Sequence, residues 1–193
     1  MTDVSTLIVA IPIPPKVREE LIRHPTVLRY HDPSVIAEKL RIAIGRISFH
    51  ETIDVIIAKI INAHLPFFKS TIGGEIIGYI KGVDEPMVLL SAQNSIDRYM
   101  RKTILEEGLG IVPFPALILS LLGELHTEGV SFRSRNDHTV SIPFLVEELE
   151  LILTNPQTGQ IQSIHNIALE DNLPLFRESL WPSVISVRNR RLR

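Results

Sequence analysis

Two segments near the C-terminal end, residues 147–154 and 160–169, constrain the fold more than any other part of this sequence. Along the first segment every second residue is a leucine, at Leu149, Leu151 and Leu153. Because successive side chains of a β-strand point to opposite faces, this alternation predicts a strand with one buried face. The residues between the segments, 155–159, include proline and glycine, which are typical of turns. The pair therefore predicts an antiparallel hairpin, and with it an antiparallel sheet.

The beginning of the chain combines a strand signal with a helix signal. Residues 6–13 are apolar and largely β-branched, and prolines close the run, so they predict a buried strand. A helix is expected to begin near Pro15 and to end at Arg23, because proline is favoured in the first turn of a helix and the residue before Pro25 avoids the helical conformation. Residues 26–30 are expected to form a short strand.

Residues 32–45 carry the signals of another helix. Asp32 followed by Pro33 is a typical helix start, and Gly45 suits the position just behind the last helical residue. We therefore predict a helix over residues 35–44.

The best candidate for a functional site follows this region, and its local structure can be interpreted in two ways. If residues 46–53 form a strand, the period of two puts His50 and Thr52 on one face. An imidazole and a hydroxyl side by side can bind a phosphate. On this interpretation the strand presents a phosphate-binding pair.

The second interpretation makes the same residues part of a helix. If Ser48 is the N-cap residue, Ser48 and Glu51 form a capping box, and residues 49–63 are an amphipathic helix. Its apolar stripe would consist of Ile53, Ile56, Ile57, Ile60 and Ile61. His50 would then lie in the first turn and have no chemical role. The local pattern favours this helix.

The remaining elements follow from similar signals. A helix is expected from Asn94 or Ser95 to about residue 107, with Gly108 behind it. Residues 116–125 are apolar on every side, which fits a buried helix or a buried strand equally well. Further strands are expected at 67–72, 75–81, 87–92, 129–132 and 138–144. Together with the hairpin, these elements predict an α+β fold with two strand-rich halves.

Composition bounds the kind of protein. The chain has 193 residues, which suits one domain with a sizeable core, and 45% hydrophobic residues with few aromatics make that core aliphatic. A net charge of −2 excludes a global basic field for nucleic acid. We predict a single domain over residues 1–172. A tail, 173–193, is expected to pack on it through Trp181 and to end in a basic stretch.

The absence of cysteine removes thiolate chemistry and fits a reducing compartment. The N-terminus lacks the basic first region of a signal peptide, and no segment approaches the ~18 apolar residues of a spanning helix. We therefore expect a cytoplasmic protein with no membrane partner. The spacing of His, Asp and Glu suggests no metal site, and there is no phosphate loop, so no metal and no cofactor is expected.

Several segments, in this order, resemble the 2H phosphoesterase superfamily, whose members include 2′-5′ RNA ligase-like proteins and cyclic phosphodiesterases. Residues 7–22 resemble the family's first strand and helix, and residues 66–74 resemble the strand after its second helix. Residues 85–91 and 95–105 are similar to its middle strand and third helix, and residues 146–170 to its last hairpin. The resemblance implies two-lobed antiparallel sheets with flanking helices.

The family's signature is a pair of His-x-Thr/Ser motifs, one in each lobe, which face each other across a cleft. His50 and Thr52 stand about where the resemblance implies the first motif, although the acidic residue between them is unusual. The nearest match to the second is His138 with Ser141, whose hydroxyl comes one residue late, so a β-bulge would be needed to bring both to one face. A different alignment puts residues 115–118 there, which contain neither histidine nor threonine.

The resemblance implies a metal-independent phosphodiesterase that acts on RNA or on a cyclic nucleotide or oligonucleotide. His50 and His138 would be the acid–base pair, because the ordinary pKa of histidine, about 6.5, suits proton transfer near neutral pH. Thr52 and Ser141 would donate hydrogen bonds to the phosphate oxygens. The expected partner is a nucleotide or RNA phosphodiester. The incomplete second motif leaves an alternative, a catalytically inactive α+β binding or structural protein of the same or an unrelated fold.

Overall fold

The computed structural model describes residues 5–49, 52–74, 77–80, 86–89, 93–99, 108–123, 125, 130–132, 140–155, 158 and 160–170. The predicted tail, residues 173–193, lies outside these ranges. Within them the elements in chain order are β1 (Ser5–Pro12), α1 (Pro15–Arg23), α2 (Pro25–Tyr30), a 3₁₀ turn (Pro33–Val35), β2 (Arg41–Phe49), α3 (Ile53–Asn62), β3 (Phe68–Gly74), β4 (Ile77–Ile80), β5 (Pro86–Leu89), α4 (Gln93–Tyr99), β6 (Ile111–Ser120), β7 (Val130–Phe132), β8 (Val140–Val146), β9 (Glu148–Thr154) and β10 (Ile161–Ala168).

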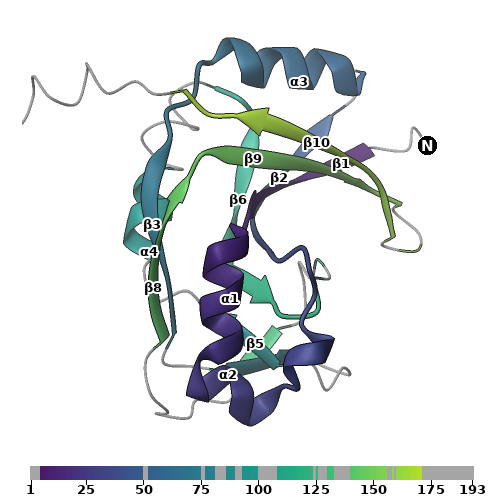
Figure 1. Ribbon diagram of the computed structural model, residues 1–193. Coiled ribbons are helices and arrows are strands. Elements are labelled where there is room, and N and C mark those ends of the chain that lie inside the picture. Colours follow the sequence, from purple (N-terminus) through teal and green to yellow (C-terminus); the bar gives the residue numbers. More distant parts are fainter. Residues whose placement is uncertain are drawn as a thin grey trace, which may run out of the picture.

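The described strands form two sheets (Figure 1). The larger has the strand order β10-β9-β1-β2-β6-β5-β4-β7, and the smaller consists of β3 and β8. Strand β1 pairs with β9 and strand β2 pairs with β6, so segments from both ends of the chain are neighbours in the large sheet. All of these pairings are antiparallel, and helices flank the sheets. The predicted α+β class with antiparallel sheets is therefore confirmed.

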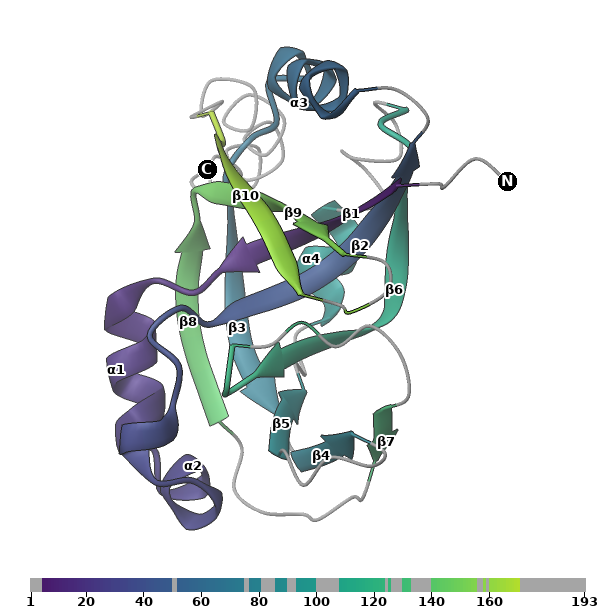
Figure 2. The same cartoon turned by 90° about the vertical axis from the view of Figure 1, so that its right-hand side faces the viewer.

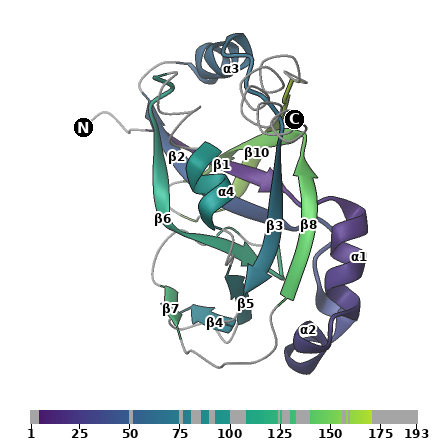
Figure 3. The same ribbon diagram turned by 90° about the vertical axis from the view of Figure 1, so that its left-hand side faces the viewer.

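The large sheet has two faces that pack differently. One face carries the main aliphatic core, to which helices α1, α3 and α4 contribute, and Figure 3 shows α4, β3 and β8 on this side. Figure 2 looks at the opposite face, which carries a small second cluster. Its buried members are Ile8, Ala10, Ala43 and Ile152, with Phe114 and Leu125 packed against them.

The structure confirms the hairpin and the beginning of the chain. Strands β9 and β10 pair antiparallel over Glu148–Thr154 and Ile161–Ala168, and the Asn155 amide donates a 2.8 Å hydrogen bond to the Gln160 carbonyl at the turn. Strand β1 and helix α1 also form where they were predicted. The later strand predictions have counterparts in β3, β4, β5, β7 and β8. Each of these elements was predicted from residues that lie within it or next to it in the sequence.

The predicted helix over residues 35–44 is wrong. Asp32 does accept a 2.9 Å hydrogen bond from the Ser34 amide, which lowers the pKa of its carboxyl, but the turn that it caps ends at Val35. Strand β2 then begins at Arg41. Ile42 is buried in the main core and Ala43 in the opposite cluster, so this part of the strand is buried on both faces. A run buried on both faces has no period that distinguishes a strand from a helix.

The structure also corrects the prediction for one further segment and decides between the two alternatives for another. Residues 26–30 belong to helix α2 instead of the predicted strand. The ambiguous segment 116–125 is a strand as far as Ser120, where β6 ends. Strand β6 lies between β2 and β5, and such a central strand is again apolar on both sides.

Gly45 marks a close approach of strands instead of a helix end. The register of β2 against β6 shifts between Ala43 and Gly45. A Cβ at this position would lie 2.8 Å from the Val112 carbonyl oxygen and 2.9 Å from Cγ2 of Ile111. The glycine is therefore needed because β6 comes too near for a side chain.

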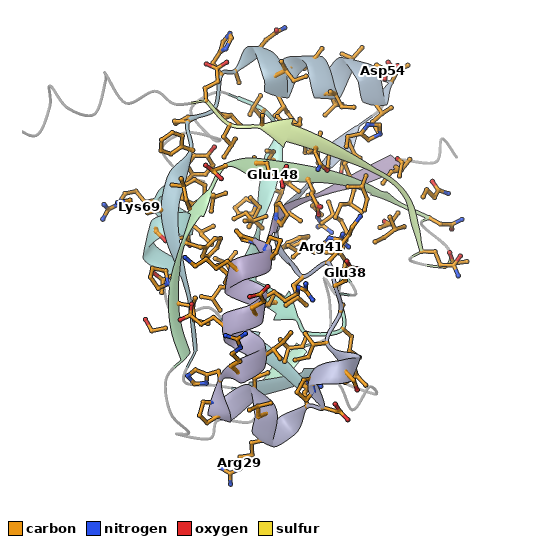
Figure 4. All side chains as sticks on the ribbon, viewed as in Figure 1. Arg29, Glu38, Arg41, Asp54, Lys69 and Glu148 are labelled. Carbon is orange, nitrogen blue, oxygen red and sulfur yellow. The ribbon has the colours of Figure 1, made fainter. Side chains whose placement is uncertain are left out.

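A buried ion pair lies on the face of the second cluster. The Nε of Arg41 donates a 2.8 Å hydrogen bond to Oε2 of Glu150, and the two side chains are 5% and 9% exposed. In register Arg41 is opposite Pro12, and Glu150 is opposite Ala10, so the pair reaches across β1. Figure 4 shows Arg41 among the strands. Each charge depends on the other, because a single buried charge is costly.

Candidate functional site

The junction between β2 and α3 carries the first predicted motif, and its structure combines parts of both interpretations. Strand β2 continues to Phe49, and Ser48 pairs with Thr6 of β1 in register. Helix α3 begins at Ile53. The capping box on Ser48 is therefore wrong, because Ser48 is an exposed strand residue. His50 itself, with the residue after it, lies outside the described residues.

Ser48→Ala is expected to change the free energy of unfolding by no more than about 0.5 kcal/mol, as for other exposed positions. Loss of a true N-cap side chain would cost about 1 kcal/mol. Urea denaturation of the two proteins measures the difference. A cost of 1 kcal/mol or more would restore the capping role.

Thr52 is the N-cap residue of α3. Its carbonyl accepts hydrogen bonds from the amides of Val55 at 3.1 Å and Ile56 at 3.4 Å. Its side chain makes no capping hydrogen bond and is exposed. The first amides of a helix have no partner within the helix, and an anion is favoured there by the helix dipole. The junction therefore offers a hydroxyl and helix amides to a phosphate.

Helix α3 buries its isoleucine stripe much as the pattern predicted. Ile56 and Ile60 are buried, and Ile53 and Ile57 pack partly against the main core. Ile61 is the exception, with 53% of its surface exposed. It lies at the margin of the stripe, about 80° around the helix from Ile53 by the 3.6-residue period. The buried stripe is what fixes α3, and with it Thr52, over the sheet.

Ser141 lies far from Thr52. It is an exposed residue near the beginning of β8, opposite Gly73 of β3. Figures 1, 2 and 3 all show α3 at the top of the molecule, whereas β8 begins in the lower half. Figure 4 labels Asp54 at the start of α3, at the upper right. The structure thus does not bring Ser141 and Thr52 together, and His138 lies outside the described residues.

The alternative second motif, residues 115–118, lies in the middle of β6. Ile118 is opposite Ala43 of β2, and Leu117 and Ile118 are buried. None of the four residues has an ionisable side chain. If the second motif corresponds to this segment, it supplies no acid and no base.

Other chemical groups in the described part of the chain add little to this site. Burial raises the pKa of Tyr99 far above its ordinary value, so its phenol stays neutral near pH 7. Among the described residues, no group of three or more His, Asp or Glu side chains is placed to hold a metal ion. None of the helices in the described ranges has the length and apolar character needed to span a bilayer.

Comparison with known proteins gives structural neighbours but no sequence relatives. No protein-family model matches the sequence, and no curated protein matches it. Escherichia coli LigT with 3′-AMP is 15% identical, with a TM-score of 0.47, and the match covers 88% of this chain and 100% of that chain. LigT with phosphate is 13% identical over the same shares, with a TM-score of 0.48.

A further neighbour is a solved structure described as a phosphoesterase. It is 15% identical, with a TM-score of 0.48, and the match covers 86% of this chain and 99% of that chain. At such low identities the residue roles of these proteins do not transfer to this chain.

Proposed function

We propose that this protein is a metal-independent phosphodiesterase that acts on RNA or on a cyclic nucleotide or oligonucleotide at the β2–α3 junction. The observation that carries the proposal is the exposed Thr52 hydroxyl, which makes no capping hydrogen bond although it stands at a helix N-terminus two residues after His50. A phosphate is favoured at such a helix end. A cytoplasmic location, which the lack of cysteine favours, would give access to these substrates.

His50 is the proton-transferring group in this proposal. Its imidazole takes a proton from the attacking water or hydroxyl and can return it to the leaving oxygen, because its ordinary pKa is about 6.5. Thr52 and the first amides of α3 donate hydrogen bonds to the non-bridging phosphate oxygens, where charge builds up. The position of Ser141 gives no support to His138 and Ser141 as partners at the same site. The proposal therefore rests on His50 and Thr52.

We expect turnover of at least one substrate in a screen of 2′,3′-cyclic nucleotides, 2′-5′ oligonucleotides and cyclic dinucleotides. The activity should persist in EDTA, because histidine supplies both acid and base. Product formation followed by chromatography, with and without EDTA, measures both properties. Activity that disappears with EDTA and returns with added divalent cation would reject the histidine mechanism.

A second candidate function is that of a non-catalytic binding or structural protein. The separation of Ser141, near the beginning of β8, from Thr52 at the start of α3 favours it, because Ser141 then does not complete a second motif beside Thr52. In that case the wild-type protein would turn over none of the substrates. Nucleotide binding without turnover, measured by calorimetry, would identify a binding protein.

A further inference from the structure

Arg46 lies on the face of the large sheet opposite the main core. Arg46 of β2 is exposed, and it makes no ion pair with any residue that the structure describes. Its direct cross-strand neighbours are Ile8 of β1 and Val112 of β6. Directly opposite residues in antiparallel strands point to the same face. The exposed guanidinium therefore stands between Val112, which is exposed, and Ile8, which is buried.

The apolar surroundings of Arg46 extend across the sheet. Ile8 is opposite Ile152 of β9, which is opposite Ile164 of β10, so these residues form one row. Val112 is 54% exposed and Ile164 is 37% exposed, whereas Ile8 and Ile152, which lie between Arg46 and Ile164, are buried. We call Ile8, Arg46, Val112, Ile152 and Ile164 the Arg46 row. Figure 2 looks onto this face.

Among the described residues of this face, Glu148 accepts a 3.4 Å hydrogen bond from Asn166 and is not paired with Arg46. Arg41 and Glu150, which lie on the same face, neutralise each other through their hydrogen bond. The nearest described neighbours of Arg46 along its own strand on this face are Ala43 and Ser48, which carry no charge. A guanidinium that has no described ion-pair partner and lies beside apolar side chains is suited to a ligand that carries both a negative charge and a flat apolar group.

We infer that Arg46 and the exposed Val112 beside it form a subsite for single-stranded RNA, in which Arg46 binds a second phosphate of the chain whose first phosphate lies at the β2–α3 junction. This inference rests on the proposed function and narrows its substrate class to oligonucleotides. Arg46 lies three residues before the end of β2, which is about 10 Å at the usual strand rise. One phosphate cannot occupy both places, whereas two phosphates of one chain can. Val112, the direct cross-strand neighbour of Arg46, then offers apolar contact to a base, whose flat face tolerates any sequence.

The test is binding of a fluorescently labelled oligoribonucleotide of roughly eight nucleotides, a length within the range of single-strand binding sites. Fluorescence anisotropy at several salt concentrations gives Kd and its salt dependence. For Arg46→Gln we expect a Kd about tenfold higher, and a slope of log K against log salt reduced by about 0.7, as for one lost phosphate contact. The matched control is Arg23→Gln, because Arg23 is an exposed arginine at the end of α1. It should bind like the wild type.

Three results would overturn the inference. They are no binding by the wild type, equal binding by Arg46→Gln, and binding of an acidic peptide such as poly-glutamate as tight as that of RNA. The assay needs no turnover, so it separates this inference from the proposed function. Binding that depends on Arg46 without hydrolysis would reject the enzyme and keep the subsite, whereas hydrolysis of cyclic mononucleotides with no RNA binding would do the reverse. Melting curves check that both variants are folded.

Discussion

Arg41→Ala is expected to lower the free energy of unfolding by roughly 3–5 kcal/mol. The substitution leaves the Glu150 carboxylate, whose side chain is 9% exposed, without its 2.8 Å partner. An uncompensated charge inside a protein is costly because it has lost its hydration. For a chain of this length the melting temperature should fall by about 6–20 °C. Urea denaturation and thermal melting measure the two quantities.

The matched control is the double variant Arg41→Met with Glu150→Leu. The double variant leaves no unpaired buried charge. We therefore expect its free energy of unfolding to be far higher than that of Arg41→Ala. Their difference separates the cost of an unpaired charge from that of lost packing. If Arg41→Ala costs less than about 1 kcal/mol, as for an exposed pair, the ion pair is not buried in solution.

His50→Ala is expected to reduce phosphodiesterase activity by about 10²–10⁴-fold, which is the usual contribution of a positioned acid or base. The reason is the loss of the group that moves the proton, while Thr52 and the amides of α3 remain to bind the phosphate. The fall should therefore appear in kcat more than in KM. Initial rates over a range of substrate concentrations measure both.

Two further histidine variants complete this test. His165→Ala is the control, because His165 lies on β10 opposite Leu151 and is not part of the proposed site; its rates should match the wild type. His138→Ala examines the pair that the sequence resemblance implies. A similar loss there would reinstate the two-histidine mechanism, and no loss leaves His50 to act alone. Full activity of His50→Ala would reject the β2–α3 junction as the active site.

The sequence by itself determined the elements whose signals are local. The leucine alternation before residues 155–159 predicted the β9–β10 hairpin, and the run closed by prolines predicted β1 and the start of α1 at Pro15. In each case the signal comes from residues within the element or next to it. An alternating pattern has the period of a strand, and proline fixes a helix start, whatever the rest of the chain does.

Tertiary structure alone decided the central strand and the site. The sequence around residues 35–44 fits a helix, but β2 lies between β1 and β6, where both faces of its first half, residues 41–45, are buried. The ion pair of Arg41 with Glu150 joins residues 109 positions apart, and no local pattern marks it. The same holds for Arg46, whose neighbours Ile8 and Val112 come from other strands. Sheet pairing between distant segments sets these contacts, and periodicity carries no information about which strands become neighbours.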